Sequence, residues 1–235
     1  MLMQQTLDKL YELKLTGMAH ALQEQMEHGD MGGLSFDERF SLLVDRQYTL
    51  QKDRSLTRRL QLARLKYPNA CVEDIDYRHP RGMDKGQVQE LTMCRWVAAK
   101  RNLIITGATG LGKTWLGCAF GNKACRDGFS ALYYRVPRLV EEFAVARADG
   151  TYLKMLATLA RTGVLILDDW GLSPLEGWAQ HSLLEVVDDR AGIRSTVVTS
   201  QLPVDKWHGT IGDPSVADAL LDRLVTSSSL IAMKG

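Results

Sequence analysis

Cysteine is scarce in this sequence and is scattered along it. The 235 residues include four cysteines, Cys71, Cys94, Cys118 and Cys125, and no pair of them has C-x-x-C spacing. Because that spacing is typical of zinc sites and redox motifs, we expect no metal site at these positions. We interpret all four as reduced thiols of a cytosolic protein.

Long apolar runs and a strong net charge are also absent. No stretch approaches the roughly 18 apolar residues of a membrane-spanning helix, so we expect no membrane partner. The polar N-terminus, with Gln4, Gln5 and Asp8, lacks the apolar segment of a signal peptide, and we expect none. The net charge of +1 does not by itself indicate a nucleic-acid partner.

One motif is specific. Residues 107–114, GATGLGKT, fit the pattern G-x-x-x-x-G-K-[ST] of a phosphate-binding loop. Glycines let such a loop fold tightly around a phosphate group, Lys113 supplies a positive charge for the β- and γ-phosphates, and Thr114 supplies a hydroxyl for Mg²⁺. We therefore predict a nucleotide site made by these residues: Gly107, Ala108, Thr109, Gly110, Leu111, Gly112, Lys113, Thr114 and Trp115.

From residue 102 onward the pattern alternates between strands and helices. The strands are predicted over 102–106, 130–136, 163–168, 195–200 and 229–233, and the helices over 113–127, 137–148, 152–161, 176–191 and 214–225. This alternation predicts a three-layer α/β fold with a mainly parallel five-stranded sheet. Ligands of such sheets collect at the carboxyl ends of the strands.

The first hundred residues are predicted to be helical, with a turn-rich break over 29–33. Ser35 and Glu38 form a capping box, and the helix that it opens is expected to carry Phe36, Phe40, Leu43 and Val44 on one face and to end before Pro68. Asp84 is predicted to cap another helix, leading to Trp96. We predict a helical N-terminal domain over 1–68, a linker and helix over 69–101, and the α/β domain over 102–235.

Basic residues crowd the later part of the helix that Ser35 is predicted to open. Between residues 46 and 66, Asp53 is the only acid among seven basic residues: Arg46, Lys52, Arg54, Arg58, Arg59, Arg64 and Lys66. A charge run of this kind is usually a solvated helix face. In a protein of balanced charge, however, it also favours contact with the DNA backbone.

Polar residues end two of the predicted strands. Asp168 and Asp169 follow an apolar strand; beside a phosphate loop, the first would hold Mg²⁺ and the second would orient or deprotonate the attacking water. An Asp-Asp turn by chance is the alternative. Ser200 and Gln201 end the next strand, where a side chain would sense the γ-phosphate. Arg223, near the end of the last helix, is either an ordinary surface residue or an arginine finger.

The sequence resembles the IstB family, the ATPase helper proteins of bacterial insertion sequences. These belong to the AAA+ class of P-loop ATPases and are close to the DnaC and DnaI helicase loaders. The resemblance covers nearly the whole chain, and the segments that carry it are 13–18 (LKLTGM), 107–114, 165–171 (LILDDWG), 199–203 (TSQLP) and 221–224 (LDRL).

The resemblance implies a role for each matching residue. Asp168 and Asp169 become the Walker B pair, Ser200 and Gln201 the sensor 1 position, and Arg223 a finger that acts on a neighbouring subunit. It also implies an extra helix within 137–161, on which Arg138, Arg147, Lys154 and Arg161 could face DNA. Family members often have Asn where this chain has Gln201 and Glu where it has Asp169, so hydrolysis is expected to be slow.

The function that the resemblance implies is ATP-dependent assistance to transposition. ATP and Mg²⁺ would join subunits into an oligomer on duplex DNA, which would present target DNA to a cognate transposase and activate it, in the bacterial cytoplasm beside the nucleoid. With no helical lid expected after residue 235, the neighbouring subunit would enclose the nucleotide. A helicase loader, a small-molecule kinase and a non-enzymatic scaffold with structural ATP are the alternatives.

Overall fold

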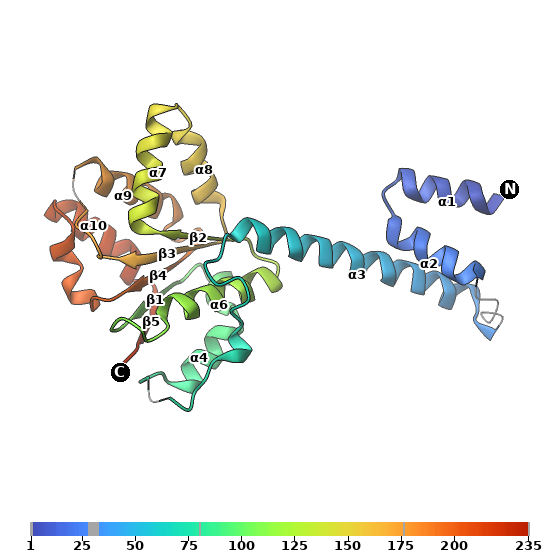
Figure 1. Ribbon diagram of the computed structural model, residues 1–235, viewed down its shortest axis with the longest axis horizontal. Helices are drawn as coiled ribbons and strands as arrows, with labels where there is room; N and C mark the ends of the chain where they lie inside the picture. Colours follow the sequence, from blue (N-terminus) through green and yellow to red (C-terminus); the bar gives the residue numbers. More distant parts are fainter. Residues whose placement is uncertain (1, 28–32, 80, 176, 235) are drawn as a thin grey trace. The chain divides into compact units, whose positions relative to one another are not determined.

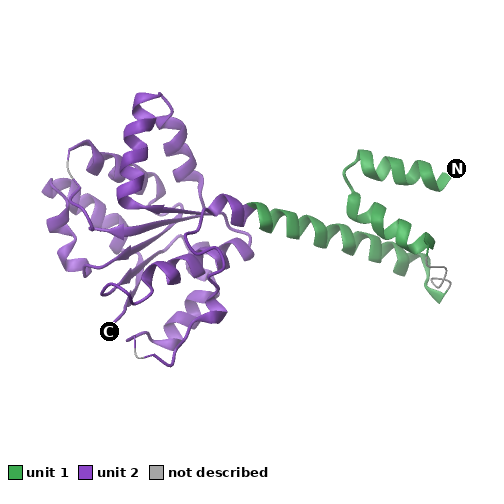
Figure 2. Ribbon diagram, in the orientation of Figure 1, with its two compact units in different colours: residues 1–58 green, residues 59–235 purple. Residues whose placement is uncertain are grey.

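The computed structural model describes residues 2–27, 33–79, 81–175 and 177–234. It divides into two compact units, residues 1–58 and 59–235 (Figure 2). The division falls inside helix α3 (Phe36–Ala63), whereas the sequence placed the boundary after residue 68. Residues 69–101 belong to the second unit because their apolar side chains are buried in it. The predicted break over 29–33 lies, apart from Gly33, outside the described residues.

The first unit contains α1 (Leu2–Glu12), α2 (Thr16–Glu27) and the first part of α3. Helix α2 crosses α3 closely at Gly17, whose backbone N–H donates to Oε1 of Gln47 at 2.8 Å. A Cβ atom at Gly17 would lie only 2.8 Å from the Gln47 Cα. The glycine of the LKLTGM segment is therefore the residue that permits this helix contact.

Helix α3 begins with the predicted capping box. The Ser35 N–H donates to Oε2 of Glu38 at 2.7 Å, and the Glu38 N–H donates to Oγ of Ser35 at 3.3 Å. The expectation of one apolar face is wrong in part: Leu43 is buried, whereas Phe36, Phe40 and Val44 are exposed. The three exposed residues recur every four positions and form a stripe beside Leu43. The buried apolar face of α3 is therefore narrower than predicted.

The second unit is built on a five-stranded, wholly parallel sheet in the order β2-β3-β4-β1-β5 (Figure 1). The strands are β1 (Asn102–Thr106), β2 (Ala131–Arg135), β3 (Val164–Trp170), β4 (Ser195–Ser200) and β5 (Ser228–Ala232). All five were predicted from their apolar runs, and the largest error at an end is two residues. The sheet order leaves β1 and β3 on either side of β4, which brings the ends of these strands together.

Helices cover both faces of the sheet. The apolar core on one face joins the sheet to α7 (Val136–Ala148), α8 (Tyr152–Arg161), α9 (Trp178–Arg190) and α10 (Pro214–Val225). On the other face lies α6 (Lys113–Arg126), where a Cβ atom at Gly117 would lie 3.7 Å from Ile166 and 3.9 Å from Val197 of the sheet. This arrangement confirms the predicted three-layer α/β fold (Figure 1).

A segment of short helices precedes the sheet and packs on α6. It contains η2 (Val72–Asp74), α4 (Lys85–Thr92) and α5 (Arg95–Ala98). Asp84 caps α4 as predicted, since its carboxylate accepts from the Gln87 N–H at 2.8 Å. The helix does not continue to Trp96, however, because Cys94 has a positive φ of 52° and starts a new turn. The Trp96 ring then meets Phe120 of α6 edge to face.

The four cysteines are free thiols, and three of them are buried. Burial raises the pKa of Cys94 to about 12 and also raises the pKa of Cys118 and Cys125, so these thiols stay protonated at neutral pH. In the described part of the chain, no three His, Cys, Asp or Glu side chains are grouped to hold a metal ion. Nor does any helix there have the length and apolarity needed to cross a membrane.

Candidate nucleotide-binding site

The loop over 107–112 connects β1 to α6 and depends on three glycines with positive φ: Gly107 at 149°, Gly110 at 86° and Gly112 at 91°. Such angles strain residues that have a Cβ atom. A Cβ atom at Gly107 would also lie 2.5 Å from the Met233 carbonyl oxygen, so the loop packs directly on the chain leaving β5. Its end is the N-terminus of α6, where unpaired backbone N–H groups favour an anion.

Lys113 is the first residue of α6, and its ammonium group is directed back across the loop. The Nζ atom donates to the Ala108 carbonyl at 2.7 Å, and the residue is only 8% exposed. Burial lowers the pKa of Lys113, while the nearby carboxylates of Asp168 and Asp169 act in the opposite direction. A positive charge is thus held where the phosphates of a bound nucleotide would lie.

Asp168 is fully buried at the end of β3 and is surrounded by hydroxyl groups. Its Oδ1 accepts from Thr114 at 2.8 Å and also from Thr199 of β4, and its Oδ2 accepts from the Tyr133 hydroxyl of β2 at 2.6 Å. Burial and the Asp168 charge raise the pKa of Tyr133, which keeps it a donor. Three elements therefore fix one carboxylate beside the Thr114 hydroxyl.

This hydroxyl–carboxylate pair fits Mg²⁺. The ion prefers oxygen ligands and usually takes one or two carboxylates together with water and substrate phosphates. Thr114 and Asp168 supply such oxygens next to the phosphate loop. The residues that support Asp168, Tyr133 and Thr199, were not found from the sequence, because Tyr134 lies beside Tyr133 in β2 and β4 contains three other hydroxyl residues.

Asp169 has a backbone in the left-handed region, with φ of 61°. The register between β3 and β4 shifts at this position. The Asp169 Oδ2 accepts from Nε of Arg135, at the end of β2, at 2.8 Å. This ion pair raises the pKa of Arg135, and it was not predicted from the sequence.

A cavity of about 320 Å³ joins these groups. Its walls include Thr109, Lys113, Thr114, Asp169 and Gln201. The Gln201 Oε1 accepts from the Thr109 hydroxyl at 2.9 Å, which ties the end of β4 to the phosphate loop. We name this cavity the phosphate pocket. Four segments far apart in the sequence therefore meet at the carboxyl edge of the sheet, as predicted for a ligand site of this fold.

Ser200, which was predicted to share the position of Gln201, does not line the phosphate pocket. It is fully buried, and its hydroxyl donates to the Trp170 carbonyl at 2.7 Å. Side chains alternate between the two faces of a strand, so adjacent residues at its end point to different places. Gln201 is the residue of this pair that lines the phosphate pocket.

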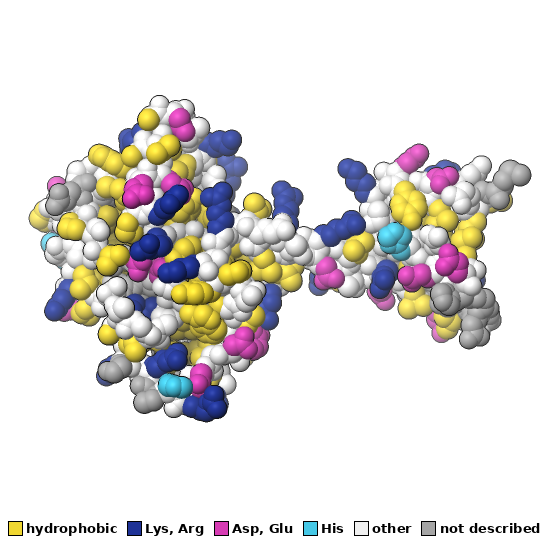
Figure 3. Space-filling model, in the orientation of Figure 1, with side chains coloured by type: hydrophobic (Ala, Val, Ile, Leu, Met, Phe, Trp, Pro, Cys, Tyr) yellow, Lys and Arg dark blue, Asp and Glu magenta, His cyan; other side chains and the backbone are white. Residues whose placement is uncertain are grey.

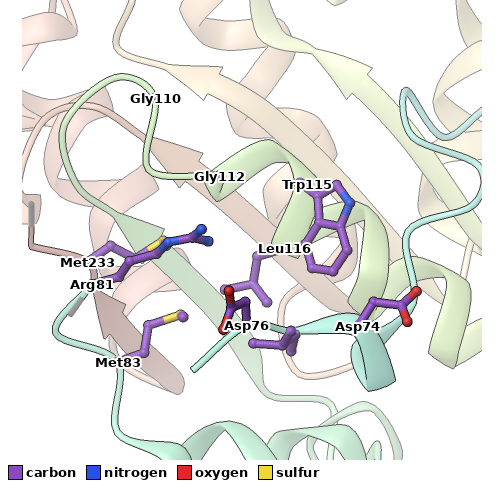
Figure 4. A pocket seen from close by; sticks show the side chains of 10 residues that line it. Asp74, Asp76, Arg81, Met83, Gly110, Gly112, Trp115, Leu116 and Met233 are labelled. Carbon is purple, nitrogen blue, oxygen red and sulfur yellow. The ribbon is translucent and has the colours of Figure 1, made fainter. Parts of the chain in front are cut away.

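A second cavity, of about 310 Å³, lies across the loop and shares Gly110, Gly112 and Trp115 with the phosphate pocket (Figure 4). Its other walls are Asp74, Ile75, Asp76, Arg81, Met83, Leu116 and Met233. In Figure 4, the apolar Leu116 lies between the Trp115 ring and Arg81, and the apolar Met83 and Met233 lie beside Arg81. This mixture suits a flat heterocycle with polar edges, and only Trp115 and the glycines were predicted from the sequence.

The family model of the IstB-like ATP binding protein matches residues 8–235. The chain belongs to this family. Protein y4pL of Sinorhizobium fredii (strain NBRC 101917 / NGR234), which is named as an insertion sequence ATP-binding protein, is 49% identical over the whole chain and 96% of its own length. The ATP-binding protein of insertion sequence IS1162 from Pseudomonas fluorescens is 51% identical over 86% of the chain and 88% of its own length.

Solved structures share the fold of this IstB-like chain. The structure of DnaI matches 70% of the chain and 91% of its own with a TM-score of 0.60 and 22% identity. The DnaC helicase loader matches 72% of the chain and 99% of its own with a TM-score of 0.57, and AMPPCP-bound DnaA from Aquifex aeolicus matches 71% and 50% with a TM-score of 0.59. The α/β unit thus has the AAA+ P-loop fold, as the sequence predicted.

Arg223 of this IstB-like chain lies outside both cavities. It is in the last turn of α10, its Nε donates to the Asp188 carboxylate of α9, and its Nη1 donates to the Ala219 carbonyl at 3.1 Å. Its side chain is still 32% exposed. The residue therefore does not serve the nucleotide site of its own chain in this arrangement.

The residues predicted to contact DNA differ in how firmly they are held. Arg54, Arg58, Arg64 and Lys154 are exposed, with Arg64 in the left-handed region at φ 50°. Arg46 lies 3.9 Å from Glu24, and the Lys52 ammonium sits 4.5 Å from the centre of the Tyr48 ring. Arg59 donates to the Cys125 carbonyl at 2.9 Å, so it binds the end of α6. Arg147 stacks on Tyr152 at 4.0 Å and donates to Ser182 at 2.9 Å.

Proposed function

We propose that this IstB-like protein hydrolyses ATP with Mg²⁺ in the phosphate pocket. The observation that carries the proposal is that Lys113, Thr114, Asp169 and Gln201 line one cavity. Water would attack the γ-phosphorus, the bond to the bridging oxygen would break, and ADP and inorganic phosphate would leave. Asp169 would accept the proton of the attacking water, and the Gln201 amide would hold the γ-phosphate.

The other residues of the pocket would prepare this step. Lys113 would neutralise the β- and γ-phosphates, and the N–H groups at the start of α6 would bind their oxygens. Thr114 and Asp168 would hold Mg²⁺, which when bound neutralises phosphate charge as it develops. Asp168 is fixed for this task by Tyr133 and Thr199.

The ion pair between Asp169 and Arg135 would restrain hydrolysis. The Arg135 guanidinium donates to Oδ2 of Asp169 and would compete with the attacking water for that carboxylate oxygen. Arg135→Ala is therefore expected to raise the basal ATP turnover, by up to about fivefold, since a partly exposed ion pair contributes about 1 kcal/mol at most. Steady-state phosphate release at saturating ATP and Mg²⁺ measures this.

Arg138→Ala is the matched control for Arg135→Ala. Arg138 lies in the first turn of α7 and pairs at 3.6 Å with Glu142, outside the phosphate pocket. Its loss should leave turnover unchanged. A fall in turnover for Arg135→Ala with unchanged ATP affinity would show that Arg135 assists the reaction and does not restrain it.

We further propose that ATP joins copies of the chain into an oligomer on duplex DNA, which presents target DNA to a transposase and activates it. Relatives that match this chain along nearly all its length are named for insertion sequences, which supports a role in transposition. Exposed Arg54 and Arg58 on α3 supply charges for the DNA backbone. Basic side chains also gather in the middle of the face of the second unit that Figure 3 shows.

Arg54 and Arg58 are expected to contact phosphates of duplex DNA. Each phosphate contact releases counterions, so Arg54→Gln or Arg58→Gln should weaken binding and lower the slope of log K against log salt by about one. Fluorescence anisotropy on a labelled duplex at several salt concentrations measures both. Arg39→Gln, at the start of the same helix, makes the same charge change and should leave the slope as it is. An unchanged slope for Arg54→Gln and Arg58→Gln would remove them from the DNA surface.

A helicase loader is the second candidate, favoured by the fold shared with DnaI and the DnaC helicase loader. A loader would bind a helicase and single-stranded DNA, whereas a transposition helper should assemble on duplex DNA without a helicase. Electron microscopy of the protein with duplex DNA, with and without an ATP analogue, separates the two. Assembly that needs both duplex and analogue supports the helper; no assembly on duplex contradicts it.

A further inference from the structure

The chain that leaves helix α3 runs along the phosphate-loop helix α6. It is held there at three positions of α6 that face the same way, Cys118, Gly121 and Asn122. Burial raises the pKa of the Cys118 thiol, and hydrogen bonds from the backbone of Tyr67 and Lys66 oppose that rise. The Asn122 side chain donates to the Pro68 carbonyl at 3.1 Å. The Pro68 carbonyl is therefore hydrogen-bonded to α6.

Gly121 allows this close approach. A Cβ atom there would lie 2.6 Å from Cδ1 of Ile166 and 3.1 Å from Cδ2 of Leu65, so a larger residue would require both side chains to move. Leu65 and Ala63 are buried. Arg64 between them has a left-handed backbone, which ends α3 abruptly. The exit of α3 is thus fixed relative to the phosphate loop by packing, by backbone geometry and by hydrogen bonds.

This packing places Lys66 and Tyr67 in the wall of the phosphate pocket. They lie in it with Thr114 and Asp169, the groups proposed to hold Mg²⁺ and to activate water. The Lys66 ammonium lies 5.6 Å from the centre of the Tyr67 ring, so the two side chains stay together. No carboxylate pairs with Lys66 in the described part of the chain, and its charge is available to an anion.

We propose that Lys66 is a second triphosphate-binding lysine, which contacts the terminal phosphate of ATP and so ties the exit of α3 to the nucleotide. The proposal rests on ATP binding in the phosphate pocket. Lys113 at the base of the loop would serve both ATP and ADP, whereas Lys66 lines the pocket together with Thr114 and Asp169, the residues proposed to act on the phosphate that hydrolysis removes. Lys66 is a positioning and sensing residue, and it takes no part in the proton transfer.

The test compares AMPPNP and ADP by isothermal titration calorimetry in the presence of Mg²⁺. Lys66→Ala should weaken AMPPNP binding about tenfold, as expected for one charge-assisted hydrogen bond to phosphate, and change ADP binding by less than about twofold. Lys66→Arg, which keeps the charge, should restore most of the difference. Lys206→Ala, an exposed lysine outside the pocket, should change neither.

A structural role for Lys66 would give a different result, since a disturbed loop weakens both nucleotides equally. Equal loss for AMPPNP and ADP, or no loss at all, overturns the proposal. If the unmodified chain binds neither nucleotide, the proposed ATPase function fails first, and the two failures remain distinct. As a second measurement, AMPPNP but not ADP should slow amide hydrogen exchange over 64–68, and Lys66→Ala should remove that difference; equal protection by both nucleotides contradicts the coupling to α3.

Discussion

Lys113→Ala is expected to abolish measurable ATP binding, with an increase in Kd of at least about 100-fold. The Lys113 ammonium is buried and fixed to the Ala108 carbonyl at 2.7 Å, so its position over the loop is set before a nucleotide arrives. Removing one partner of a buried charged contact costs about 3 kcal/mol or more. Isothermal titration calorimetry with ATP and Mg²⁺ measures the loss, and ATP-dependent assembly on duplex DNA should disappear with it.

Lys123→Ala is the matched control for this variant. Lys123 lies on the same helix, α6, and pairs with Asp127 away from both cavities. The Lys123→Ala variant should bind ATP like the unmodified chain. Thermal unfolding of both variants shows whether each is folded. ATP binding by a folded Lys113→Ala within about tenfold of the unmodified chain would contradict the assignment of the loop. ATP-dependent oligomers of that variant on duplex would contradict the proposed mechanism.

Much of the fold could be predicted because its signals are local. The apolar runs that form β1 and β3 can be recognised as strands from their residues alone. A phosphate loop likewise needs its glycines and Lys113 in one short stretch. The capping box of Ser35 and Glu38 likewise acts within one helical turn. These features depend on residues close in the chain, so the sequence order alone contains them.

The supports of the proposed Walker B acids could not be predicted in this way. Tyr133 and Thr199 reach Asp168 only because β2 and β4 flank β3, which is a property of the sheet order. The pair of Asp169 with Arg135 is further accompanied by a positive φ at Asp169, the last residue but one of β3. Neither the strand order nor an unusual backbone angle at an aspartate can be read from spacing.

The walls of the two cavities show the same limit on a larger scale. Met83 and Met233 come from segments without any motif, and they meet beside the loop only after β5 has joined the sheet next to β1. Lys66 was predicted as one of a run of basic residues that favour DNA. Packing of the α3 exit on α6 instead places it in the phosphate pocket. The same charge run therefore divides between two surfaces, which charge alone does not distinguish.

Arg223→Ala is expected to keep ATP binding and to lose ATP turnover by at least about 100-fold, because an arginine finger supplied by a neighbour is worth that much or more. Arg223 lines neither cavity of its own chain, and its side chain is partly exposed. Mixing the Arg223→Ala variant in equal amounts with an Asp169→Asn variant should restore activity in about a quarter of the sites. That is the share in which an intact Asp169 meets an intact Arg223 across a head-to-tail interface.

Asp188→Ala distinguishes this role from a structural one. Asp188 is the carboxylate that holds Arg223 within the chain, so its loss breaks the same ion pair and leaves the arginine in place. If the pair only joins α9 to α10, both variants should lose turnover alike, and mixing should rescue neither. If Arg223 reaches a neighbouring site, Asp188→Ala should keep its turnover, since the arginine no longer has to leave a partner. The trans role thus requires that turnover is restored in the mixture and that Asp188→Ala keeps its turnover. The absence of either result contradicts it.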